Sequence, residues 1–176
     1  GSSANTYVGS RLTGNDAYLV TSSTAAEASS SNLWNFNLQN SFDQGASTSA
    51  AWVGWHWARA RGYFDVATYT GTGSAKTVSH NLGVVPEMIW VKNRDAAKDW
   101  TVFHKGLNGG TNPETYAIFL SLANAEFDSA TRWNDTAPTS SVFSVGTAAQ
   151  TNGSGNDMIA YLFATVAGVS KVGSFQ

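Results

Sequence analysis

Short apolar and aromatic segments, each bounded by Gly, Asn or Asp, run through the whole sequence, and helical periodicity is nearly absent. Segments this short, rich in Val, Ile, Thr and aromatic residues, are typical of half-buried strands joined by tight turns. We expect strands at residues 17–21, 51–59, 65–70, 76–80, 87–94, 100–104, 117–122, 142–145 and 158–164. The pattern therefore predicts an all-β fold, most simply a sandwich of two antiparallel sheets.

Two alanine-containing segments, at 24–30 and 122–130, allow a second interpretation. Each suits a short helix, and Thr24 with Glu27 has the spacing of a helix-capping box. Polar Ser, Thr and Asn residues follow both segments closely, which favours a strand end and an irregular loop. We expect loops in both places.

The composition includes enough hydrophobic residues for a core but few charged residues that could contact a partner. Hydrophobic residues make up 42% of the chain and charged residues only 12%, about half the usual share. With a net charge of -2 there is no basic surface for phosphates, so no nucleic-acid partner is expected. No apolar run approaches the ~18 residues of a membrane span. The chain has no cysteine, which excludes disulfides and thiolate metal ligands.

An internal repeat is suggested by two segments that begin at Ala17 and Tyr116. Each contains an aliphatic strand, an Ala-Glu pair, a Trp-Asn pair, a Phe, a turn and an aromatic-containing strand. The matching pairs are Ala26-Glu27 with Ala125-Glu126, and Trp34-Asn35 with Trp133-Asn134. Because Glu27 and Glu126 are equivalent, we expect a structural role for both, such as bonding loop amides.

The repeat divides the chain into two parts. Residues 1–62 form an N-terminal repeat half, in which Gly-Ser-Ser at 1–3 has the composition of a tag remnant. Residues 63–176 hold a central block, without counterpart in the repeat, and the second repeat half. We expect one compact β domain overall, although the sequence leaves open whether residues 1–62 fold with the rest.

His80 raises the question of catalysis or metal binding. It ends the expected strand at 76–80, directly before the turn Asn81-Leu82-Gly83. In that place its ring can bond a carbonyl or amide of the turn, which needs neither a metal nor a reaction. His56, His80 and His104 form none of the HxH, HxxxH or HExxH patterns, so we expect no metal site and no cofactor.

Several motifs, taken together, resemble a repeated domain of tail-fibre-like proteins from marine and other tailed phages and prophages. They are YTGTGSAKTVSHNLGVVPEMIWVKNR, WTVFHKGLN, RWNDTAPTSSVFSVG and NGSGNDMIAYLFA. The resemblance implies a virion-surface or extracellular β domain, with a jelly-roll or concanavalin-like sandwich and neighbouring repeats of the same fibre as partners. It implies no catalytic residues.

The sequence offers no enzymatic signature. Glycoside hydrolysis needs two carboxylates across a cleft, and the spacing of the Asp and Glu residues singles out no pair. The GxSxG elbow and the GxxxxGK[ST] phosphate loop are both missing. We therefore expect that the chain is not an enzyme. A polysaccharide-cleaving activity has less support from the sequence than carbohydrate binding or a structural spacer role.

Carbohydrate binding needs flat aromatic rings for the apolar sugar face and polar side chains for the hydroxyls. The loop-side candidates are Trp34, Trp100, Arg132, Trp133, Asn134 and Asp135. The alternative is that Trp133 covers the end of the core while Asp135 caps a turn. A calcium loop at Asn152 to Asp157 is a further possibility, but this run has a single carboxylate and suits a turn better.

The sequence thus predicts a non-catalytic tail-fibre-like domain that binds carbohydrate on a host or environmental surface. The alternative is a structural spacer that stacks along a fibre and binds no ligand. A homo-oligomer is compatible with either, although no coiled-coil heptad is present to enforce one.

Overall fold

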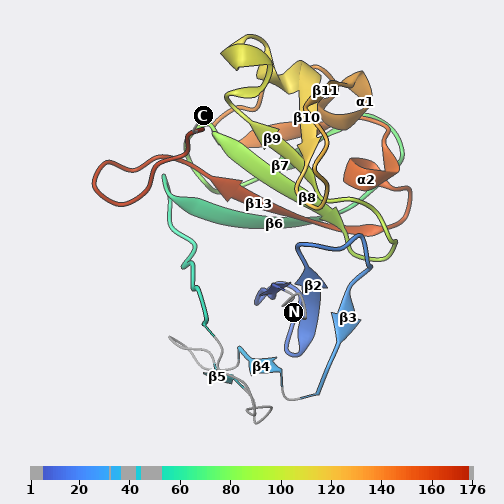
Figure 1. Cartoon of the computed structure of the whole chain (residues 1–176), viewed down its shortest axis with the longest axis vertical. Coiled ribbons are helices and arrows are strands. Elements are labelled where there is room, and N and C mark those ends of the chain that lie inside the picture. Colours follow the sequence, from blue (N-terminus) through green and yellow to red (C-terminus); the bar gives the residue numbers. More distant parts are fainter. Residues whose placement is uncertain (1–5, 32, 37–42, 45–52, 175–176) are drawn as a thin grey trace.

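The computed structural model describes residues 6–31, 33–36, 43–44 and 53–174 (Figure 1). Its centre is a six-stranded antiparallel sheet in the order β11-β10-β9-β8-β13-β6. The strands are β6 (Phe64–Thr70), β8 (Met88–Asn93), β9 (Thr101–His104), β10 (Tyr116–Phe119), β11 (Phe127–Asp128) and β13 (Asp157–Phe163). The all-β class predicted from the sequence is confirmed.

Strand β13 shows why this sheet is covered on both faces. Side chains alternate across a strand, so Met158, Ala160 and Leu162 face one side while Ile159 and Tyr161 face the other. All five are buried. A strand that buries both faces needs a covering layer on each, and the chain supplies two.

The first covering layer is the antiparallel pair β7 (Lys76–Ser79) and β12 (Val142–Val145), together with the short helix α1 (Ala130–Trp133). Its apolar side chains join those of the large sheet in the main core. This core comprises Ala67, Val78, Leu82, Ile89, Val91, Phe103, Ala117, Trp133, Phe143, Val145, Met158, Ala160, Leu162 and Ala164.

The second covering layer is the N-terminal sheet of β1 (Tyr7–Val8), β2 (Ala17–Val20) and β3 (Ala28–Ser29), drawn in blue in Figure 1. Leu19 of β2 is buried in a second core with Trp100 and Tyr161. The Trp100 indole Nε1 also donates a hydrogen bond of 3.0 Å to the carbonyl of Val20. These contacts join the N-terminal strands to the large sheet.

The remaining elements are short. A separate pair is formed by β4 (Trp34–Asn35) and β5 (Asp43–Gln44). Two 3-10 turns, η1 (Leu107–Gly110) and η2 (Pro113–Thr115), precede β10, and α2 (Ala149–Asn152) precedes β13. None of the helices within the described ranges has the length and apolar character needed to cross a membrane.

Most of the strands expected from the sequence are present. The segments at 17–21, 65–70, 76–80, 87–94, 100–104, 117–122, 142–145 and 158–164 overlap β2, β6, β7, β8, β9, β10, β12 and β13, in that order, and β6, β10 and β13 each begin one residue earlier than expected. The two alanine-containing segments are loops that lead into the two-residue strands β3 and β11, so the loop interpretation is confirmed for 24–27 and 122–126.

The strand expected at 51–59 is wrong for residues 53–59, while 51–52 lie outside the described residues. Residues 53–59 pair with none of the described strands and are exposed throughout. A segment with alternating apolar residues forms a strand only where a partner strand lies beside it to complete the hydrogen bonds. Here the apolar side chains remain on the surface instead.

The two proposed repeat halves share a hairpin register but not a fold. In β2–β3, Ala17 pairs with Ser29, and in β10–β11 the equivalent Tyr116 pairs with Asp128. Beyond the hairpins the halves differ, because Trp34 lies in strand β4 and its counterpart Trp133 lies in helix α1. The internal repeat remains a prediction.

Candidate functional site

A polar depression of about 230 Å³ lies where β6 and β8 end and β13 begins. Its lining residues are Thr68, Tyr69, Thr70, Arg94, Asp157 and Met158. The sheet register brings them together, since Thr70 pairs with Asp157 and Arg94 directly follows β8. The side chain of Tyr69 faces the opposite side of the sheet, where it packs against the main core and its hydroxyl donates to the Thr151 carbonyl at 2.5 Å.

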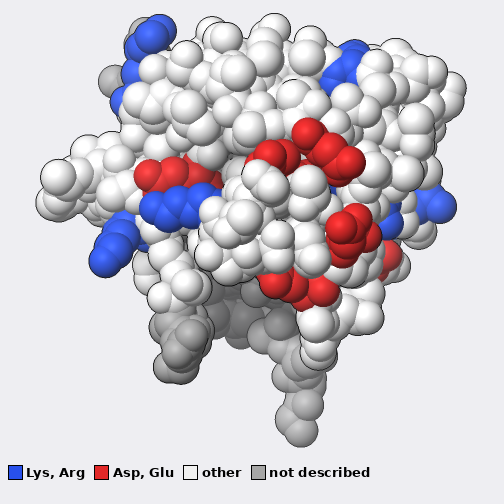
Figure 2. All heavy atoms as spheres, turned by 90° about the horizontal axis from the view of Figure 1, so that it is seen from above, with Lys and Arg blue, Asp and Glu red and all other residues white. Residues whose placement is uncertain are grey.

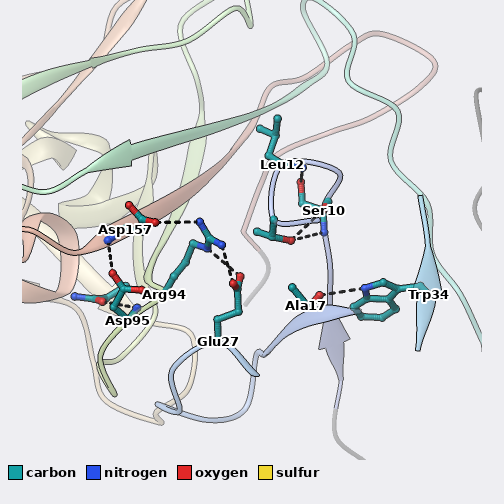
Figure 3. A network of polar contacts seen from close by, with 10 residues as sticks. Ser10, Leu12, Ala17, Glu27, Trp34, Arg94, Asp95 and Asp157 are labelled. Atoms are coloured by element: carbon teal, nitrogen blue, oxygen red, sulfur yellow. Dashed lines mark hydrogen bonds and ion pairs between the residues drawn. The ribbon is translucent and has the colours of Figure 1, made fainter. Parts of the chain in front are cut away.

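Arg94 is fixed by Glu27 of the N-terminal segment (Figure 3). Its Nε and Nη2 donate to Oε2 and Oε1 of Glu27 at 2.9 and 2.7 Å. The Glu27 amide also donates to the Arg94 carbonyl at 2.7 Å. The hydrogen bond with Glu27 is the main reason that the Arg94 pKa lies above its ordinary value, so the guanidinium stays charged.

The Nη1 group of Arg94 is held less tightly. It lies 3.8 Å from Oδ2 of Asp157, beyond hydrogen-bond distance, and the Asp157 side chain is 58% exposed. Thr70 Oγ1 approaches the other carboxylate oxygen at 3.5 Å. A donor, an acceptor and the exposed hydroxyls of Thr68 and Thr70 therefore border one small polar surface.

Buried asparagines hold the loops beneath this surface. The Asn93 Nδ2 donates to the Ala149 carbonyl at 2.9 Å, and its Oδ1 accepts from the Ala96 amide at 2.9 Å and from Asn156 Nδ2 at 3.1 Å. The Asn152 amide group bonds three further backbone groups. The run 152–157 thus uses these amides to bond the protein itself, as the turn interpretation predicts.

The tryptophans expected to bind sugar do not present open ring faces to solvent. Trp100 is fully buried and Trp133 is 2% exposed, so neither offers a ring face to solvent. The Trp133 ring makes an edge-to-face contact with Phe103 in the main core. Trp34 is half-buried and its Nε1 donates to the Ala17 carbonyl at 3.0 Å (Figure 3). Loop-side exposure was wrong for Trp100 and Trp133, because each completes an apolar layer.

The polar part of the RWND run ends a helix. Arg132 lies over the rings of Phe119 and Phe127, at 5.5 and 5.7 Å, and its Nη1 donates to Gln150 at 2.6 Å. Asn134 and Asp135 are exposed in left-handed conformation, with φ of 55° and 45°, directly after α1. The six predicted residues therefore share no single surface, and the depression near Arg94 contains none of them.

A family model with the description "Domain of unknown function (DUF7483)" matches residues 3–176. The chain belongs to the DUF7483 family. No curated protein and no solved structure matches it.

His80 of this DUF7483 domain braces its turn with both ring nitrogens. Nε2 lies 3.2 Å from the Thr139 carbonyl, and Nδ1 accepts from the Leu82 amide at 3.2 Å. A neutral ring with its proton on Nε2 satisfies both contacts. Burial lowers the His80 pKa, against smaller opposing effects of Thr139 and Asp65. Within the described residues no three His, Asp or Glu side chains are grouped to hold a metal.

Replacing His80 with leucine is expected to destabilise the domain by about 1–3 kcal/mol at neutral pH, because the buried Leu82 amide and the part-buried Thr139 carbonyl both lose their partner. A lowered folded-state pKa means that the benefit of neutral His80 is present above its unfolded value and is lost as pH falls through the folded pKa. Urea unfolding at several pH values should show the difference between wild type and H80L shrinking below pH ~6.5. The exposed His56→Gln variant is the control, and a difference that is the same at every pH would contradict this assignment.

Lys92 of the DUF7483 domain is fully buried beside the same N-terminal segment. Its Nζ donates to the carbonyls of Thr24 and Asn93, at 3.1 and 2.9 Å. Burial lowers the Lys92 pKa to about 8, while Asp99 opposes this shift. Lys92 and Arg94 thus hold two neighbouring points of residues 24–27 against the large sheet.

Proposed function

We propose that this chain is a non-catalytic domain of a fibre-like surface protein, and that it binds carbohydrate hydroxyls in the depression beside Arg94. The fibre-like, extracellular setting rests on the sequence resemblance. The carbohydrate proposal rests on one observation: a charged donor, a charged acceptor and two threonine hydroxyls border the same small depression.

The chemistry of these groups matches neighbouring hydroxyls on a sugar ring. A hydroxyl can donate to the Asp157 carboxylate while the adjacent hydroxyl accepts from Arg94 Nη1. Thr68 and Thr70 can act in either role. Glu27 fixes the guanidinium in place, which lowers the ordering cost on binding. A depression of about 230 Å³ has room for one sugar unit rather than a long chain, so we expect modest affinity.

The carboxylates near the site support a binding role over a catalytic one. Glu27 is held by Arg94, and Asp95 Oδ2 accepts from the backbone amide of Asp157 at 2.6 Å. Hydrolysis of a glycosidic bond requires two carboxyl groups set on either side of that bond. Here the nearby carboxylates bond protein groups, which leaves Asp157 as the exposed acceptor.

The proposal is tested with a panel of glycans and bacterial surface polysaccharides, using the labelled domain. Asp157→Asn and Thr68→Val should each retain the fold, because both side chains are exposed. D157N should weaken binding about tenfold or more, since a hydrogen bond to a charged group contributes ~1.5–3 kcal/mol. Asp128→Asn, an exposed carboxylate on β11, is the matched control and should bind as wild type.

The spacer alternative predicts a different outcome. It is favoured by the burial of Trp133, which removes the most site-like tryptophan from the surface. If no glycan on a broad panel binds saturably, the carbohydrate proposal is wrong and the spacer is the better explanation. If D128N weakened glycan binding as much as D157N does, the depression would also be rejected as the binding site.

A further inference from the structure

The segment 53–59 displays large apolar side chains to solvent. Val53 is 80%, Trp55 76% and Trp57 51% exposed, although aromatic side chains are usually buried. The backbone of 53–59 is irregular and pairs with none of the described strands. This segment lies at the opposite end of β6 from the depression beside Arg94, so it is independent of the proposed carbohydrate site.

The segment is anchored to the sheet at its C-terminal end. Arg59 Nε donates to the buried Asp65 carboxylate at 2.7 Å, and Ala60 forms a β-bridge with Phe64. The ring of Trp57 lies 6.3 Å from that of Phe64. An anchored apolar segment has lost part of its conformational freedom already, which favours association.

Other exposed apolar residues lie in loops at the same end of the sheet. The register pairs Phe163 with both Phe64 and Met88, so the start of β6, the start of β8 and the end of β13 lie together. Figure 1 shows the chain before β6, in cyan, and the loop after β13, in red, leaving this end. Val84, Val85 and Val169 in the adjoining loops are 41%, 51% and 71% exposed.

We propose that residues 53–59 pair antiparallel with the same segment of a second copy of this chain. Two arguments favour a second copy. Residues 53–58 contain no Lys, Arg, Asp or Glu, and the charge of Arg59 is neutralised by its own Asp65, so self-pairing opposes no like charges. Antiparallel pairing also sets the tryptophans of both copies against each other, and such cross-strand aromatic pairs are stabilising.

The available area agrees with a modest dimer. From the exposed fractions and ordinary side-chain areas, the apolar residues of this end offer roughly 600 Å² per copy. Two copies together then bury about 1,200 Å², at the lower end of stable interfaces. We expect a dimer with a Kd on the order of micromolar. On the face drawn in Figure 2, Lys, Arg, Asp and Glu also occupy few positions among uncharged residues.

Sedimentation velocity over a wide concentration range tests the dimer. Wild type should shift from monomer to dimer, and Trp55→Ser should remain monomeric at concentrations tenfold or more above the wild-type midpoint. Trp55 is exposed, so W55S should leave folding intact, which circular dichroism checks. Leu122→Ser, which removes a 45%-exposed apolar side chain in a different loop, is the matched control and should dimerise as wild type.

The absence of native cysteine allows a test of strand direction. When residues 53–59 of two copies pair antiparallel over their full length, Trp55 lies opposite Trp57 of the other copy and Gly54 lies opposite Ala58. A mixture of Gly54→Cys and Ala58→Cys should therefore form disulfide-linked dimers more readily than either variant alone. A monomer at every concentration, a dimer unaffected by W55S, or equal loss in L122S would overturn the proposal. Preferential linking of each variant to itself would overturn the antiparallel pairing.

Discussion

Replacing Trp100 with alanine is expected to destabilise the domain by about 3–5 kcal/mol, because a fully buried indole leaves a cavity that a packed core fills only in part. Trp100 packs beside Tyr161 in the second core, and its Nε1 donates to Val20. The substitution therefore removes both packing and a hydrogen bond between the large sheet and the N-terminal layer. Urea unfolding followed by circular dichroism measures the effect.

Trp55→Ala is the matched control for this experiment. It removes the same side chain from a position that is 76% exposed, so its effect on monomer stability should stay within about 0.5 kcal/mol. Measurements at low concentration keep any dimer from contributing. If W100A cost less than 1 kcal/mol, or no more than W55A, the N-terminal strands would not be packed on the large sheet as described.

The second large effect is expected at Asn152, which is fully buried. Its Nδ2 donates to the carbonyls of Ser74 and Gly146, both at 2.6 Å, and its Oδ1 accepts from the Thr72 amide at 2.8 Å. Aspartate has the same shape, but its carboxylate cannot donate. N152D leaves the buried Gly146 carbonyl without a donor, removes one of the two donors to the Ser74 carbonyl (the other is Thr72 Oγ1) and places a carboxylate in a buried position. It should destabilise the domain by about 2–5 kcal/mol.

The destabilisation by N152D should also be smaller in acid, where a protonated carboxyl can donate to one of the two carbonyls. Thermal unfolding of N152D at neutral and acidic pH, each compared with wild type, measures this. Asn134→Asp is the control, because Asn134 is exposed at the end of α1 and should tolerate the change. Equal stability of N152D and N134D would show that the bonds of Asn152 are not needed.

Much of the fold was predictable from local patterns. Short apolar runs at 158–164 and 88–91 marked β13 and β8, since a run of this length between turn residues is typical of a strand that is buried on both faces. His80 before its turn was predicted to bond turn groups, and it does so through Leu82. The prediction for Glu126 also agrees, because its carboxylate accepts from the amide of Asn108.

The candidate site was not predictable in the same way. Arg94, Asp157 and Glu27 lie far apart in the sequence, and only the β8–β13 ladder and the packing of the N-terminal segment bring them together. Glu27 was expected to bond loop amides and instead fixes Arg94. No local spacing signals such a group, because its members meet through strand pairing.

The sequence by itself determined the secondary-structure class, most strand positions and the bracing role of His80, because these depend on neighbouring residues. Only the tertiary structure decided which tryptophans are core and which are surface. Trp100 and Trp133 lie where sheets and a helix close over them, whereas Trp55 and Trp57 lie where no described strand comes alongside. A tryptophan has the same chemistry in both settings, and its burial depends on which distant segments pack against it.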